Sequence, residues 1–207
     1  LIAVAASGAL VDGDHIMAIA AVDLAHRGLL RNKGVAVTVM TNLGFHHTMR
    51  DNNIDVVITP VGDRSILVAL DEFDFVLGGE QSGHVIHRAH ATTGDGLLAA
   101  LQLVEYITRA RVTLDQAASI MHSYPQILVN IRTLNRVHDP VHDIADQIAI
   151  AEAELGDNGR ILVRSSGTEP LVRVMVEAAD QVSAESIAMR LAQAVVDLHG
   201  GSIEGTH

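Results

Sequence analysis

The sequence contains no cysteine and no tryptophan, and aromatic residues make up only 2% of its 207 positions. The lack of cysteine excludes disulfides, thiolate metal ligands and a cysteine nucleophile, and it suits a reducing compartment such as the cytoplasm, where we expect the protein to reside. With so few aromatic rings, the core must be mainly aliphatic. The apolar content of 48% is ample for one large globular domain or two small ones.

Basic residues are also scarce: 14 Lys and Arg stand against 25 Asp and Glu, which gives a formal net charge of −11 at pH 7. Nucleic acids and anionic membranes attract clustered basic side chains, so neither is an expected partner. No apolar run reaches the roughly 18–20 residues that cross a bilayer. The chain opens Leu-Ile-Ala-Val-Ala-Ala without a charged leader, which indicates the interior of a strand and no signal peptide.

Residues 12–123 alternate between helical and strand patterns. Strands are predicted over 35–40, 56–59 and 73–77, and helices over 14–30, 45–52, 65–72, 95–106 and 114–122. This alternation predicts an α/β domain of three layers, with a parallel or mixed sheet between helices. Ligands of such sheets bind beyond the carboxyl ends of the strands. Loops rich in glycine and polar residues follow three of them, at 41–44, 60–64 and 78–84.

Ser123-Tyr124-Pro125 interrupts this pattern and predicts a domain boundary. The predicted order beyond it is a strand over 127–134, a helix over 141–155, strands over 160–164 and 171–178, and a helix over 184–198. Residues 124–200 are therefore expected to form a small α+β domain with two helices on one face of a sheet. Residues 201–207 are expected to be a frayed tail.

The stretch Arg-Ser-Ser-Gly-Thr-Glu-Pro at 164–170 joins two predicted strands of the second domain, and Arg173 lies on the strand that follows. Backbone N–H groups in a tight turn, hydroxyls and a guanidinium are the donors that bind a phosphate dianion, and the glycine allows close approach of the backbone. These residues predict a phosphate-binding loop. The alternative is a polar hairpin turn without a ligand.

The stretch Gly-Gly-Glu-Gln-Ser-Gly-His at 78–84 brings a carboxylate, an amide, a hydroxyl and an imidazole together at a strand end. An ionised carboxylate accepts hydrogen bonds from two neighbouring hydroxyl groups, so these side chains suit the vicinal hydroxyls of a sugar. The alternative is a flexible turn in which Glu80 is merely solvated.

Twelve histidines raise the question of a metal site. His46 and His47 are adjacent and point to different sides of a helix, while Asp139-Pro140 separates His138 from His142. Neither pair has a third ligand nearby, so no histidine metal site is predicted. A Ser/His/Asp triad stays open as an alternative, although no Gly-x-Ser-x-Gly motif occurs.

The stretch Asp12-Gly13-Asp14 places two carboxylates at the start of a predicted helix. A loop of this kind can bind magnesium. Acidic side chains at a helix start also cap free N–H groups and meet the positive end of the helix dipole. The position therefore favours a helix cap over a metal site.

Five motifs in order carry a resemblance to a known family. They are Val-Asp-Gly-Asp-His-Ile-Met at 11–17, Val-Gly-Asp-Arg at 61–64, the 78–84 stretch, Thr-Thr-Gly-Asp-Gly at 92–96 and the 164–170 stretch. In this order they resemble the α-D-phosphohexomutases, and within that family its bacterial amino-sugar branch. The resemblance implies four domains around a cleft. It maps 1–11 to the last strand of domain two, 12–123 to domain three and 124–200 to domain four.

The resemblance also implies the roles of the loops. The implied sugar-binding residues are Glu80 and Ser82, with His84 beside them. The implied ligands of the phosphate that is not transferred are Arg164, Ser165, Ser166, Gly167 and Thr168, with Arg173 near. Asp63 and Arg64 would lie in a cleft loop of domain three. The implied reaction interconverts glucosamine 6-phosphate and glucosamine 1-phosphate through a bisphosphate, and a neutral hexose phosphate as substrate is the alternative.

Two parts of the family pattern are missing from these residues. Neither a Thr-Ala-Ser-His-Asn-Pro-like motif, which would carry the phosphoryl group, nor an Asp-Gly-Asp-Gly-Asp-Arg magnesium loop occurs. Phosphoryl transfer needs a nucleophile and a cation. We therefore expect no catalytic residue and no metal ligand in this chain, which alone should be inactive. The resemblance implies that domains one and two supply both the serine and Mg²⁺. A non-catalytic remnant that binds sugar phosphates is the other alternative, and no oligomeric state is implied.

Overall fold

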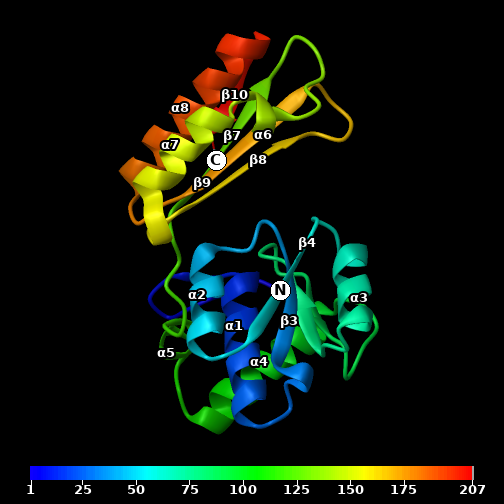
Figure 1. Cartoon of the computed structure of the whole chain (residues 1–207). Helices are drawn as coiled ribbons and strands as arrows, with labels where there is room; N and C mark the ends of the chain where they lie inside the picture. The colour runs from blue at the N-terminus through cyan, green and yellow to red at the C-terminus, as the bar shows by residue number, and fades with distance from the viewer. Residues whose placement is uncertain (207) are drawn as a thin grey trace. The chain divides into compact units, whose positions relative to one another are not determined.

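The computed structural model describes residues 1–206 and divides into two compact units, one of Leu1–Ser123 and one that begins at Tyr124 (Figure 1). Each unit has its own sheet and its own apolar core. Among the described residues, no helix is long and apolar enough to cross a membrane.

The first unit is built on a four-stranded sheet in the order β4-β3-β5-β6. Its strands are β3 (Gly34–Thr38), β4 (Asp55–Thr59), β5 (Leu77–Gly79) and β6 (Val85–His87). Strand β3 pairs in parallel with β4 and β5, and β6 runs antiparallel to β5, so the sheet is mixed. This arrangement confirms the predicted α/β class.

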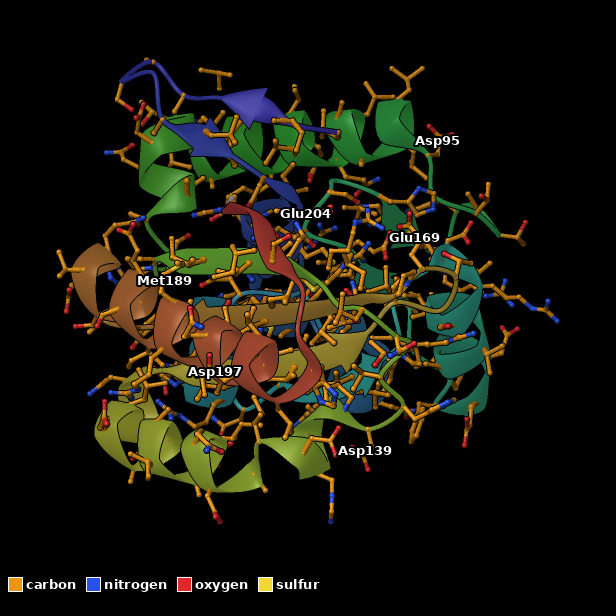
Figure 2. All side chains as sticks on the ribbon, turned by 90° about the horizontal axis from the view of Figure 1, so that it is seen from above. Asp95, Asp139, Glu169, Met189, Asp197 and Glu204 are labelled. Atoms are coloured by element: carbon orange, nitrogen blue, oxygen red, sulfur yellow. The ribbon has the colours of Figure 1, made fainter. Side chains whose placement is uncertain are left out.

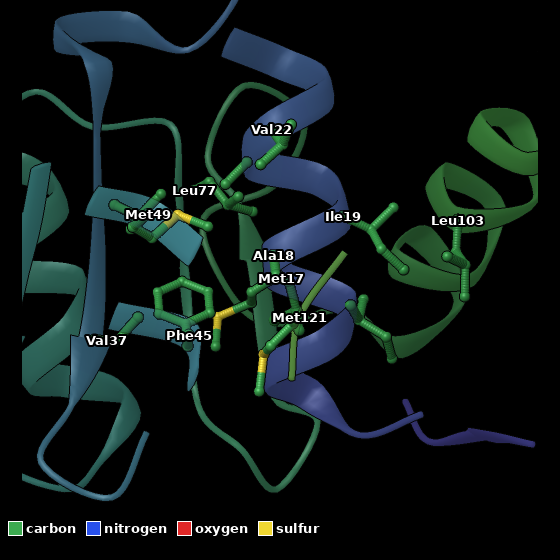
Figure 3. Close-up of a cluster of buried hydrophobic side chains, with 14 of the residues drawn as sticks. Met17, Ala18, Ile19, Val22, Val37, Phe45, Met49, Leu77, Leu103 and Met121 are labelled. Atoms are coloured by element: carbon green, nitrogen blue, oxygen red, sulfur yellow. The ribbon is translucent and has the colours of Figure 1, made fainter. Parts of the chain in front are cut away.

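Five helices pack around this sheet: α1 (Gly13–His26), α2 (Leu43–Asp51), α3 (Asp63–Glu72), α4 (Gly96–Ala110) and α5 (Leu114–Ala118). Val35 and Val37 of β3 face α1 and α2, whereas Ala36 between them faces α3 on the other side. The main core lies between α1, α2 and the sheet, where Phe45 is its one large ring and the other side chains are aliphatic or methionine (Figure 3).

The strand predicted over 73–77 is wrong in its bounds, because the chain turns at Asp74, which has φ 52°, and β5 begins only at Leu77. Phe75 and Val76 are buried although both precede β5, and the carbonyl of Val76 still accepts from the N–H of Arg88 at 2.8 Å. The ring of Phe75 lies over Gly34, where a Cβ would come within 2.1 Å of it.

Residues 1–11 form two short antiparallel strands, β1 (Ala3–Val4) and β2 (Leu10–Val11), where one strand was predicted. The turn between them includes Gly8, whose φ of +88° favours glycine. That these residues belong to a preceding domain stays a prediction.

The second unit is an antiparallel sheet in the order β10-β7-β9-β8. Its strands are β7 (Gln126–Arg132), β8 (Arg160–Ser165), β9 (Leu171–Glu177) and β10 (Ser202–Thr206). Helices α7 (Ala145–Leu155) and α8 (Gln181–His199) cover one face of this sheet, and the short α6 (Pro140–Asp143) precedes them. The predicted α+β class is confirmed.

The frayed tail expected after residue 200 is wrong for residues 202–206, which form β10 along β7. Gly200 and Gly201, with φ of +67° and +104°, turn the chain back from α8 toward the sheet. In Figure 2, α8 carries the labelled Met189 and Asp197 and is followed by β10 with Glu204. Glu204 pairs with Arg132 of β7, which ties the end of the chain to the sheet.

The start of α1 shows what Asp12-Gly13-Asp14 does in the structure. The Asp12 carboxylate accepts a hydrogen bond from the backbone N–H of His15 at 3.1 Å, so the predicted helix cap is confirmed. Burial acts to raise the pKa of Asp12, but hydrogen bonds from His15 outweigh it and lower that pKa. Asp14 is fully buried, and its Oδ2 accepts from the backbone N–H of Asn42 at 2.8 Å.

Asp14→Ala should destabilise the first unit by about 1–3 kcal/mol, because it removes a buried acceptor of the Asn42 N–H. The matched control is Asp51→Ala, which removes an exposed carboxylate paired with Arg50. Urea unfolding followed by circular dichroism measures the difference. Equal unfolding midpoints for the two variants would contradict a structural role for Asp14.

Stability should also depend on pH through His87. Burial lowers the pKa of His87 to about 4, with a further contribution from the charge of His90, whereas the ordinary value is 6.5. Between these two values the unfolded chain binds more protons than the folded one. The free energy of unfolding should therefore fall as the pH drops from 6.5 toward 4, by about 3 kcal/mol in total.

His87→Gln should remove this part of the pH dependence, and His26→Gln, at an exposed histidine, should leave it in place. Urea unfolding at a series of pH values makes the comparison. A pH profile that is the same in His87→Gln and the unchanged protein would contradict the assignment.

Candidate functional site

The loop between β5 and β6 is a tight turn that carries the predicted sugar-binding residues. The backbone N–H of Glu80 donates to the carbonyl of His84 at 3.0 Å, and that of Gly83 donates to the carbonyl of Glu80 at 2.9 Å. Gly83 has φ +92°, a conformation that side chains disfavour. The turn fixes the backbone positions of Glu80, Ser82 and His84 before any ligand binds.

This loop rests on the first turn of α1. The N–H of Gly13 donates to the carbonyl of Gln81 at 3.0 Å. A Cβ at position 13 would lie 2.1 Å from the carbonyl oxygen of Glu80, so only glycine lets the two backbones meet. The glycine between the two aspartates is therefore part of the support of the 78–84 loop.

A second loop, residues 60–64 after β4, contacts the same turn. The N–H of Gly62 donates to Glu80 Oε1 at 3.0 Å. Asp63 Oδ2 lies 4.0 Å from His84 Nε2. The structure thus brings together Asp63, Glu80 and His84, whereas the Arg64 side chain is exposed and has no ion pair among the described residues.

A pocket of about 580 Å³ opens beside these loops, at the carboxyl ends of β3, β4 and β5. This volume is in the range of small-molecule sites. Its polar lining is Asp12, Thr38, Glu80, Gln81 and Ser82, and its apolar lining is Ile2, Leu10, Met40 and Val61. The sequence patterns did not predict the apolar rim, because single apolar residues in four separate segments carry no common signal.

In the second unit, Arg164 of β8 stands directly opposite Arg173 of β9 in the sheet register. Like charges in this arrangement repel each other. Burial lowers the pKa of Arg164, and the charge of Arg173 lowers it further. Within the part of the chain that the structure describes, neither guanidinium has an ion pair. An anion bound between them would relieve the repulsion.

The turn after β8 uses several of its polar groups for its own support. Ser165 Oγ donates to the carbonyl of Val137 at 2.7 Å. Ser166 is buried, and its Oγ accepts from the N–H of Glu169 at 3.4 Å. These hydroxyls shape the loop, while Gly167 and Thr168 are exposed at its tip.

Arg136 is a further cation that the sequence patterns missed. Its Nη2 donates to the carbonyl of Gly167 at 2.6 Å, so it reaches the tip of the loop from a separate segment. No motif surrounds Arg136, and only the packing of 133–139 against the sheet brings it there.

The histidines form no metal site within the residues that the structure describes. The described residues contain no group of three or more His, Asp and Glu side chains that could hold a metal ion. Asp12, His15 and Ser123 do form a chain of contacts, with His15 Nδ1 2.7 Å from Asp12 and Nε2 3.3 Å from Ser123 Oγ. The carboxylate in this chain is also the cap of α1, so we assign the chain to anchoring the helix start.

Comparison with known proteins identifies both units. Residues 12–124 match the family model described as phosphoglucomutase/phosphomannomutase, alpha/beta/alpha domain III, and residues 128–194 match that of the phosphoglucomutase/phosphomannomutase C-terminal domain. The chain is 52% identical over 195 residues to a phosphoglucosamine mutase of Frankia casuarinae, covering 94% of this chain and 43% of that protein. It is 50% identical over 199 residues to a phosphoglucosamine mutase of Clavibacter michiganensis, covering 95% and 45%.

Solved structures have the same fold. An Aspergillus fumigatus N-acetylphosphoglucosamine mutase, determined with GlcNAc-6P and magnesium, superposes with a TM-score of 0.76 at 22% identity, over 96% of this chain and 46% of that one. A phosphoglucomutase/phosphomannomutase family protein of Burkholderia thailandensis gives 0.74 at 17% identity, over 98% and 45%. The chain therefore spans less than half the length of these relatives.

The position of Arg164 opposite Arg173 predicts that anions stabilise the second unit. Inorganic phosphate should raise the thermal midpoint of the chain, because it neutralises Arg164 and Arg173. In phosphate-free buffer, Arg173→Gln should match or exceed the stability of the unchanged protein by up to about 1 kcal/mol, since a like-charge contact is removed. Phosphate should no longer raise the thermal midpoint of Arg173→Gln.

Arg190→Gln is the control, because Arg190 is exposed and pairs with Glu154 on the helical side of the same unit. Thermal unfolding with and without phosphate distinguishes the variants. An equal response to phosphate in Arg173→Gln and Arg190→Gln would contradict an anion site at the pair.

Proposed function

Because the chain belongs to the phosphoglucomutase/phosphomannomutase family of α-D-phosphohexomutases, we propose that it is the sugar- and phosphate-binding half of a phosphoglucosamine mutase. The membership confirms the family predicted from the five sequence motifs. Curated phosphoglucosamine mutases are about half identical to it over nearly the whole chain, yet the chain spans only 43–45% of their length. Such an enzyme is an isomerase that interconverts glucosamine 6-phosphate and glucosamine 1-phosphate, and this chain contributes its recognition loops.

The observation that carries the proposal is the pair of arginines on β8 and β9, which have no ion pair within the described residues. In the proposed complex, Arg164 and Arg173 hold the phosphate that is not being transferred. Guanidinium groups match the geometry of a phosphate and bind it through paired N–H donors. The exposed tip at Gly167 and Thr168, between the two strands, lies within the same turn and completes the phosphate loop.

The 78–84 loop is proposed to bind the sugar ring. One carboxylate oxygen of Glu80 accepts from Gly62, which leaves the other free to accept from ring hydroxyls. Ser82 lines the same pocket and offers a hydroxyl, and His84 stands at the end of the turn beside Asp63. A bisphosphate intermediate carries a phosphate at either end of the sugar, so these groups must accept the ring in both orientations.

Magnesium has no proposed ligands in this chain, because the donor sets of its described residues do not fit one. We assign both the metal and the phosphoryl-carrying serine to the N-terminal half that the relatives possess. When bound there, magnesium supplies positive charge to the phosphoryl group in transfer. The partners of this chain are then that half and a hexosamine phosphate, and the proposed location is the cytoplasm.

The amino-sugar preference rests on the curated relatives. A neutral hexose phosphate would meet the same two loops, so phosphoglucomutase or phosphomannomutase activity is the second candidate, supported by the names of the two family models. A remnant that only binds sugar phosphates is the third.

Calorimetric titration of the chain with glucosamine 6-phosphate tests the proposal. Binding is expected, and Arg164→Ala should weaken it by about 1.5–3 kcal/mol, the range for hydrogen bonds to charged groups. Arg190→Ala is the control, because its side chain pairs with Glu154 outside the phosphate loop. Unchanged affinity in Arg164→Ala would overturn the phosphate assignment, and equal binding of glucose 6-phosphate would favour the neutral hexose.

A further inference from the structure

Two consecutive residues of the loop after β4 contact two functional groups of the loop after β5. The Gly62 N–H reaches Glu80 Oε1 at 3.0 Å, and the Asp63 carboxylate lies 4.0 Å from His84 Nε2. We propose that residues 60–64, called here the cradle loop, are a positioning element that holds Glu80 and His84 in place for the sugar. The inference rests on the proposed sugar-binding role of the 78–84 loop.

Gly62 can make its contact because it is glycine. Its φ of +121° is a conformation that L side chains rarely adopt, and with it the residue precedes α3 as its N-cap. A cap at this position usually carries a side chain that accepts from the free N–H groups of the helix. The cap residue Gly62 has no side chain to do this; Asp63 Oδ1 accepts from the N–H of Arg64 at 2.7 Å, and the N–H of Gly62 itself binds the carboxylate of Glu80.

This contact places the Glu80 carboxylate at the N-terminus of α3, the end of the helix dipole that attracts negative charge. The hydrogen bond from Gly62 to Oε1 restricts rotation of the carboxylate, and Oε2 remains to accept hydrogen bonds from sugar hydroxyls. A carboxylate that is already oriented loses less side-chain freedom on binding than a solvated one. The cradle loop therefore fixes the orientation of the Glu80 carboxylate as well as its position.

His84 is held from two sides. A Cβ at Gly94 would lie 2.3 Å from His84 Nε2 and 2.4 Å from Cε1, so the ring packs directly on the backbone there. Asp63 approaches the same nitrogen, which has no hydrogen-bond partner within the described residues. At 4.0 Å the two groups are too far apart for a direct hydrogen bond, and polar contacts of this kind often tighten only when a ligand binds.

The ligand-free chain allows a direct test of each contact by NMR. Asp63→Asn should shift the His84 ring resonances and weaken the nuclear Overhauser contact between the ring and Gly94. Glu80→Ala should speed hydrogen exchange at the Gly62 amide, roughly tenfold or more, because its acceptor is gone. The control is Asp71→Asn, on the far end of α3, where the carboxylate pairs with Arg88.

Binding of glucosamine 6-phosphate tests whether Asp63 acts through His84. Asp63→Asn should weaken binding roughly threefold to tenfold, and the double variant Asp63→Asn with His84→Gln should bind no worse than His84→Gln alone. Additive losses would mean an independent role for Asp63 and would overturn the inference. Equal affinity of Asp63→Asn and Asp71→Asn for glucosamine 6-phosphate would also overturn the inference.

The two proposals fail in different ways. No binding of glucosamine 6-phosphate by the unchanged chain would count against the proposed function. The NMR measurements need no ligand, so unchanged His84 resonances in Asp63→Asn and unchanged exchange at Gly62 in Glu80→Ala would overturn the cradle loop whatever the binding result.

Discussion

The meeting of two backbones at Gly13 is the constraint on which the first unit's candidate site depends. The carbonyls of Glu80 and Gln81 lie where a side chain at position 13 would stand, and the Gly13 N–H donates to one of them. The aspartates on either side fasten the same helix start, one as its cap and one as a buried acceptor for the loop after β3. The 78–84 loop is therefore anchored directly to the start of α1.

Much of the fold follows from local patterns. Capping residues and apolar runs predicted α1 and α4, and the alternation of strands and helices predicted the α/β class. The predicted bounds were wrong where buried residues next to a strand had the sequence pattern of a strand. They were also wrong where glycines turned the chain back toward the sheet. Phe75 and Val76 are buried but precede the first residue of β5, and Gly200-Gly201 returns the tail to β7.

The loops that form the candidate site could be predicted from the sequence, but the contacts between those loops could not. Glycine and polar residues after strands mark 60–64 and 78–84, and both loops border one pocket. That Gly62 binds Glu80, or that Arg136 reaches Gly167, depends on sheet order and loop conformation across separations of 18 and 31 residues. No local pattern encodes such pairs. The facing of Arg164 and Arg173 likewise requires the register of β8 and β9.

The register of β8 and β9 bears on how sugar specificity can change in this family. The arginines stand on paired strands of a sheet, so main-chain hydrogen bonds set the spacing of their backbone positions. In the proposed function, this pair binds the phosphate whichever sugar carries it. With the proposed roles of the two loops, new sugar preferences would arise from exchange of residues in the 78–84 loop, without a change in the sheet proposed to bind the phosphate.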